Sequence, residues 1–136
     1  MTITLAALAF ALQPGAADQP AQTSAAMQAE AEAAAAARSW LELHDAGDWA
    51  TTYAATATSF REANTQQGWA EAAESVRPPL GATRSRELLA VEILPTPEHY
   101  VQVRFRTDFA NRARVEEMLT LVHEDGDWRI VGIFLE

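Results

Sequence analysis

The sequence predicts an α+β domain in which N-terminal helices pack on a curled, four-stranded antiparallel meander. One observation is a run rich in the helix formers Ala, Glu and Gln before residue 46. Another is the change after Gly81 from helical spacing to the alternation of apolar and polar residues that half-buried strands show. Helices followed by consecutive strands form two packed layers, which is the α+β arrangement.

The first 23 residues are expected to precede the folded domain. Ile3–Leu12 is an apolar run with the length of a signal-peptide core, and it is too short to span a bilayer. No Lys or Arg precedes Arg38, so the positive start of an export signal is missing and an apolar tail is the alternative. A signal would imply a periplasmic or secreted protein. The expected boundaries are a signal peptide or apolar tail at 1–17, a linker at 18–23 and a single domain at 24–136.

Three helices are expected in the first half of the domain. The first covers residues 24–46, and Gly47 suits the left-handed residue that follows a helix. Asp48 suits the N-cap of a short second helix over residues 48–58. A third helix over residues 66–77 ends at two consecutive prolines, which cannot continue a helix.

The second half predicts four strands joined by short turns. In the first strand, Leu89 and Val91 are placed on the core side, so Arg86 falls on the opposite side. The Asp125–Gly126 pair is a strong hairpin signal before the last strand. That strand is apolar on both faces and is expected to be covered on both sides. The four strands are expected at residues 84–94, 99–109, 114–124 and 128–135.

A curled sheet beneath helices is expected to enclose a cone-shaped cavity. Large aromatic side chains are the natural lining of such a cavity, although most tryptophans in proteins are plain core residues. Trp128 and Phe134 are also expected in or near it. The pocket-lining candidates are Trp40, Trp49, Tyr53, Trp69 and Phe105.

Several short motifs, kept in order along the chain, resemble a bacterial domain-of-unknown-function family, number 4019. They include Ser39–Leu41, Asp45–Trp49, Arg77–Gly81, Ser85–Leu88 and Asp125–Gly132. The resemblance covers about residues 36–135, and the layout of elements is similar to the NTF2-like (cystatin-like) fold. The family has no established activity, so the resemblance implies a fold and a bacterial origin, often with export. One departure is Ile133-Phe134, where an aromatic residue is expected directly after the glycine.

Composition and motifs exclude several classes of function. The net charge of −9 argues against nucleic acid or an anionic membrane as a partner, since both need a basic surface. The absence of cysteine excludes disulfides, thiol catalysis and thiolate metal sites. His44, His99 and His123 lie on separate elements without metal-ligand spacing, and each is expected at the surface or at a helix end. No cofactor, metal or stable membrane span is expected.

Two glutamates and a tyrosine are the weak catalytic candidates. Glu87 is in phase with the apolar residues of the first strand, and Glu117 shares the apolar side of the third. A carboxyl group in an apolar cavity has a raised pKa and can act as an acid or base, and Tyr53 could assist. The preferred alternative is a structural ion pair with an arginine such as Arg77 or Arg86. A register shift of one residue would also turn either glutamate outward.

The opposite sheet face is expected to carry the arginines Arg86, Arg104, Arg106 and Arg129 among acidic residues. Cross-strand ion pairs explain them most simply, and a homodimer or protein-partner surface is the sharper interpretation. We therefore expect an exported, non-catalytic module that binds a protein or a small ligand. The alternatives are an isomerase- or hydrolase-type enzyme that uses buried glutamates in its cone, and a purely structural homodimer.

Overall fold

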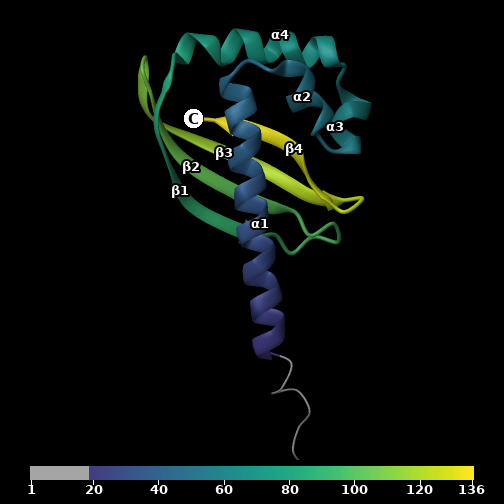
Figure 1. Ribbon diagram of the computed structural model, residues 1–136. Helices are drawn as coiled ribbons and strands as arrows, with labels where there is room; N and C mark the ends of the chain where they lie inside the picture. The colour runs from purple at the N-terminus through teal and green to yellow at the C-terminus, as the bar shows by residue number, and fades with distance from the viewer. Residues whose placement is uncertain (1–18) are drawn as a thin grey trace, which may run out of the picture.

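A computed structural model describes residues 19–136 of the chain, and the expected signal peptide or apolar tail lies outside these residues. The strands pair antiparallel in the order β1-β2-β3-β4, and the helices cover one face of the curved sheet (Figure 1), which confirms the predicted class. The elements are α1 (Gln19–Asp45), α2 (Trp49–Ala54), α3 (Thr58–Ala63), α4 (Gln66–Val76), a 3₁₀ turn (Pro78–Leu80), β1 (Thr83–Ile93), β2 (Val101–Phe109), β3 (Arg112–Glu124) and β4 (Asp127–Leu135).

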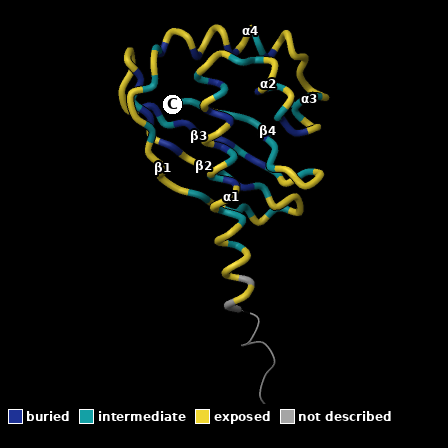
Figure 2. Tube along the Cα trace, viewed as in Figure 1, coloured by how far each residue is buried: buried dark blue, intermediate teal, exposed yellow. Residues whose placement is uncertain are grey.

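The long helix α1 begins earlier than the sequence predicted. It starts at Gln19, so residues 19–23, which were expected to be linker, are helical. Pro20 lies in the first turn, where a missing N–H costs nothing. The C-terminal half of α1 crosses the sheet and buries Ala37 and Leu41, while the N-terminal part extends beyond it and is largely exposed (Figure 2).

The turn between α1 and α2 has the cap residues that the sequence predicted, Gly47 and Asp48. Gly47 has φ +73°, which is the left-handed conformation that favours glycine after a helix. The Asp48 side chain accepts a hydrogen bond from the Thr51 N–H at 3.0 Å and caps α2. The second helix expected over residues 48–58 is instead two short helices. The chain leaves helical form between them because Ala57 N–H donates to the Ile130 carbonyl of β4 at 2.8 Å.

A bulge in β1 reverses the predicted facing of its N-terminal half. Leu88 pairs with Phe105 and Ala90 with Arg104, so Leu89 is an extra residue and the alternation changes phase there. Arg86 therefore points toward the helices and Glu87 away from them, opposite to what strict alternation predicted.

The last strand carries a second irregularity with the same effect. Its register shifts opposite Thr120 and Leu121, so Ile130 and Ile133 both face the helices. Phe134 consequently lies on the outer face, where it is 59% exposed. The expectations that Phe134 lies near an internal cavity and that the strand is covered on both sides are therefore wrong.

Large side chains fill the space between helices and sheet. Trp40 and Trp69 from α1 and α4 pack against the inner residues of β2 and β3, with Phe105 fully buried between the layers. This close apolar packing stabilises the fold. The polar side chains described below lie instead near the ends of α1 and α4 and the start of β1. An open pocket lies at the end of α1.

Candidate functional site

An open pocket of about 590 Å³ lies where α1, α4 and β1 come together. Its walls come from the last turn of α1, the corner before α2, the end of α4 and the start of β1. The chemically active side chains among its lining residues are His44, Asp45, Trp49, Glu74, Arg77 and Thr83.

Of the predicted pocket-lining aromatic residues, Trp49 lines this corner pocket. Trp40 instead lines a smaller hollow of about 170 Å³ together with Trp128. Trp69 and Phe105 belong to the buried core, and Tyr53 packs against that core. The predicted lining residues are thus divided among the corner pocket, a small hollow beside α1 and β4, and the core.

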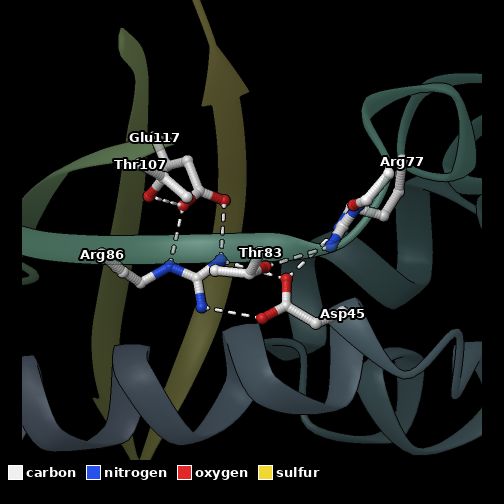
Figure 3. A network of polar contacts seen from close by, with 7 residues as sticks. Asp45, Arg77, Thr83, Arg86, Thr107 and Glu117 are labelled. Carbon is white, nitrogen blue, oxygen red and sulfur yellow. Dashed lines mark hydrogen bonds and ion pairs between the residues drawn. The ribbon is translucent and has the colours of Figure 1, made fainter. Parts of the chain in front are cut away.

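Figure 3 shows a network of charged side chains that includes the pocket-lining residues Asp45 and Arg77. Arg86 donates from Nη1 to Asp45 Oδ2 at 2.8 Å and from Nη2 to Asp45 Oδ1 at 3.0 Å. Its Nε donates to Glu117 Oε1 at 2.9 Å, and the Thr107 hydroxyl donates to the same oxygen. One arginine therefore joins α1 to β3 through two carboxylates.

Arg77 holds the other side of Asp45. Its Nε donates to Asp45 Oδ1 at 3.2 Å, its Nη1 to the Gly81 carbonyl at 2.6 Å and its Nη2 to the Thr83 hydroxyl at 3.2 Å. The guanidinium also lies 4.6 Å from the ring centre of Phe109. The two arginines balance the charges of Asp45 and Glu117, so the network is neutral as a whole.

The electrostatics of the network favour the charged forms of Asp45 and Arg86. Burial raises the pKa of Asp45, but the hydrogen bonds and charge of Arg86, with the charge of Arg77, more than offset it and the net pKa is lowered. Burial lowers the pKa of Arg86, and its bonds to Asp45 and Glu117 reverse that effect to a net rise. Both partners are therefore charged at neutral pH.

The three catalytic candidates are not brought together. Glu117 is fully buried and ion-paired to Arg86, which is the structural ion pair that the sequence analysis preferred. Glu87 is exposed on the other face of the sheet. The Tyr53 hydroxyl lies 2.6 Å from the Asn64 carbonyl, to which it donates, and so it ties α2 to the end of α3.

His44 is a buried histidine at the end of α1. It lies in the last turn of α1, as expected, but is only 2% exposed rather than at the surface. Its ring stacks on Trp40 at 5.2 Å and meets Trp49 edge-on at 5.4 Å. Burial and then the charge of Arg77 lower its pKa to about 4, so it is neutral at neutral pH. Its spacing of four residues from Trp40 puts the two side chains on the same face of α1, where they stack.

Glu74 and Trp49 form the outer wall of the pocket. Trp49 Nε1 donates to Glu74 Oε2 at 2.7 Å, which holds an exposed carboxylate beside the edge of the indole ring. Across residues 19–136 there is no group of three or more His, Cys, Asp or Glu placed to hold a metal ion. None of the helices described is both long and apolar enough to cross a membrane.

The outer sheet face carries fewer free arginines than predicted. Arg104 lies 3.6 Å from Glu116 as a cross-strand ion pair, and Arg106 is exposed. Arg129 donates to the Ala54 carbonyl at 3.0 Å, at the β4 edge of the sheet. Arg86 lies on the inner side, because of the bulge in β1.

Comparison with known proteins gives a family and a partial structural likeness. A crystal structure of an NTF-2 like protein of unknown function from Silicibacter pomeroyi is 18% identical, with a TM-score of 0.37. The match covers 54% of this chain and 57% of that one, so this chain spans little more than half of its length. No curated protein matches the chain. The family model described as "Protein of unknown function (DUF4019)" matches residues 36–133, and the chain therefore belongs to that family.

Proposed function

We propose that this domain is a non-catalytic module that binds a small ligand in the corner pocket. The observation that carries the proposal is the pocket itself, which has about 590 Å³ of space, an indole wall and polar groups at its edge. Ligand sites in proteins have this size and this combination of aromatic surface with a few polar groups.

The state of the acidic residues supports binding over catalysis. A general acid or base must reach the substrate and exchange a proton near neutral pH. Glu117 is enclosed by Arg86 and Thr107, and Asp45 is held in its charged form by two arginines. These carboxylates fix the walls of the pocket.

The test is a thermal-shift screen of small polar and charged metabolites with a blocked variant. Ala82 lines the pocket with an exposed side chain, so Ala82→Phe should fill the space without disturbing the core. Ligands that raise the Tm of the wild-type protein should have no effect on Ala82→Phe. The control, Ala72→Phe, alters an exposed position of α4 away from the pocket and should keep the response. Ligands that stabilise all three proteins equally would contradict the proposal.

Self-association through the outer sheet face is a second candidate, which Phe134 favours. This exposed ring and Met118 line a hollow of about 300 Å³ between Arg104 and the acidic residues Glu116 and Glu136. Two copies related by a twofold axis could bury both rings and pair their opposite charges. Sedimentation velocity should then show a dimer at micromolar concentration that Phe134→Asp dissociates and Met27→Asp, on the protruding part of α1, does not. A wild-type monomer would contradict this candidate.

Export to the periplasm or the medium is also part of the proposal. It is supported by the apolar run Ile3–Leu12 and the small residues that follow it in the sequence. N-terminal sequencing of the protein purified from its host would test it. Recovery of a chain that still begins at Met1 would contradict cleavage of a signal peptide.

A further inference from the structure

Two helices point their C-terminal ends at the corner pocket. α1 ends at Asp45, which lines the pocket together with Ala46 and Gly47, and α4 ends at Val76, directly before the lining residues Arg77 and Pro78. Aligned peptide dipoles place a partial negative charge at the C-terminus of a helix. The backbone alone therefore gives this pocket a negative potential from two directions.

The side chains of the pocket add to the same sign. Its charged lining consists of two carboxylates, Asp45 and Glu74, and one guanidinium, that of Arg77. The Asp45 side chain is 20% exposed and that of Arg77 only 5%. The Arg77 guanidinium already donates hydrogen bonds to Asp45, Gly81 and Thr83. Asp45 is paired with both Arg77 and Arg86, so among the described residues the lining carboxylate without a cationic partner is that of Glu74, which is exposed to a ligand.

The aromatic wall suits a ligand of positive charge. An indole face attracts a cation through its quadrupole, and the Glu74 carboxylate already lies at the edge of the Trp49 ring. His44 is the neighbouring ring, and its lowered pKa keeps it from adding a positive charge at neutral pH. Its Nδ1 is buried and has no hydrogen-bond partner in the part of the chain that the structure describes.

We propose that the ligand of the corner pocket is a small organic cation with an ammonium or guanidinium group. This inference rests on the proposed ligand-binding function and adds the chemical class of the ligand. The cationic group is held by the Glu74 carboxylate and the Trp49 indole. The net charge of −9 favours the approach of a cation over that of an anion.

The test compares organic cations with an uncharged analogue of one of them and with an anion. Choline, putrescine and agmatine are titrated into the wild-type protein beside 3,3-dimethylbutan-1-ol, the uncharged analogue of choline, and acetate. The indole N–H resonances in NMR spectra and calorimetry report binding. At least one cation should bind and shift the Trp49 resonance, and the two other probes should not bind. Loss of one exposed charge in Glu74→Gln should weaken binding about fivefold.

The variants separate failure of the ligand class from failure of the pocket. Glu71→Gln, an exposed change on the same helix, should bind the cation like the wild-type protein. Ala82→Phe should not bind it.

If only uncharged or anionic compounds bind, and Ala82→Phe abolishes their binding, the cation proposal is wrong while the pocket function stands. If cations bind Glu74→Gln and Ala82→Phe as well as the wild type, they bind the acidic surface in general, and the proposal is overturned. If no compound responds to blocking the pocket, both proposals fail.

Discussion

A carboxylate without solvent contact, such as that of Glu117, is stable only where donors surround it. The Arg86 guanidinium and the Thr107 hydroxyl supply those donors, and Asp45 balances the remaining positive charge. Such a cluster depends on all of its members, since removing one leaves an uncompensated charge in a medium of low polarity. The polar network is therefore the most sensitive point of the fold.

Substitution of Glu117 by Gln should reveal that sensitivity. The change keeps the shape of the side chain but leaves Arg86 with one anionic partner, so the free energy of unfolding should fall by about 3 kcal/mol. Glu116→Gln is the matched control, because this neighbour is 41% exposed and faces outward beside Arg104. It should cost under about 1 kcal/mol. Urea denaturation measures both, and equal losses would contradict a special role for the buried pair.

The elements show which parts of the structure a sequence can predict. Gly47 and Asp48 were assigned correctly because a cap depends on the residue itself and its close neighbours. The alternation in β2 was also read correctly, since that strand lies in the middle of the sheet and is regular over its inward residues from Val101 to Phe105. Local chemistry settles these features without help from the rest of the chain.

The bulges are what the sequence did not show. Leu89 carries no glycine or proline signal, and it becomes an extra residue only because of how β1 pairs with β2. One such residue exchanged the directions of Arg86 and Glu87, and a second shift in β4 turned Phe134 outward. The pocket escaped prediction for a related reason. Its walls come from segments far apart in the chain, whose meeting depends on the packing of α1 and α4.

At the scale of the molecule, aromatic rings join three helices at the corner. Trp40 and His44 of α1, Trp49 of α2 and Trp69 of α4 lie within 5.8 Å of a neighbouring ring centre. The cluster fixes the ends of α1 and α4, and thereby the pocket between them. His44 is the one ring in this cluster that can take up a proton, so the stability of the corner should depend on pH.

The pH dependence follows from the lowered pKa of His44, about 4 against an ordinary 6.5. As the pH falls below 6.5, the unfolded chain binds a proton that the folded chain refuses, so the free energy of unfolding should drop by about 3 kcal/mol by pH 4. Asp45, whose pKa is also lowered, loses its contribution only at lower pH, as it becomes protonated in the folded state.

His44→Phe keeps an aromatic ring in the cluster and removes the proton site. Urea denaturation at a series of pH values should therefore show a much flatter profile for this variant between pH 6.5 and 4, with stability near that of the wild type at pH 7. Parallel profiles for the two proteins would mean that His44 is open to protonation in the folded state.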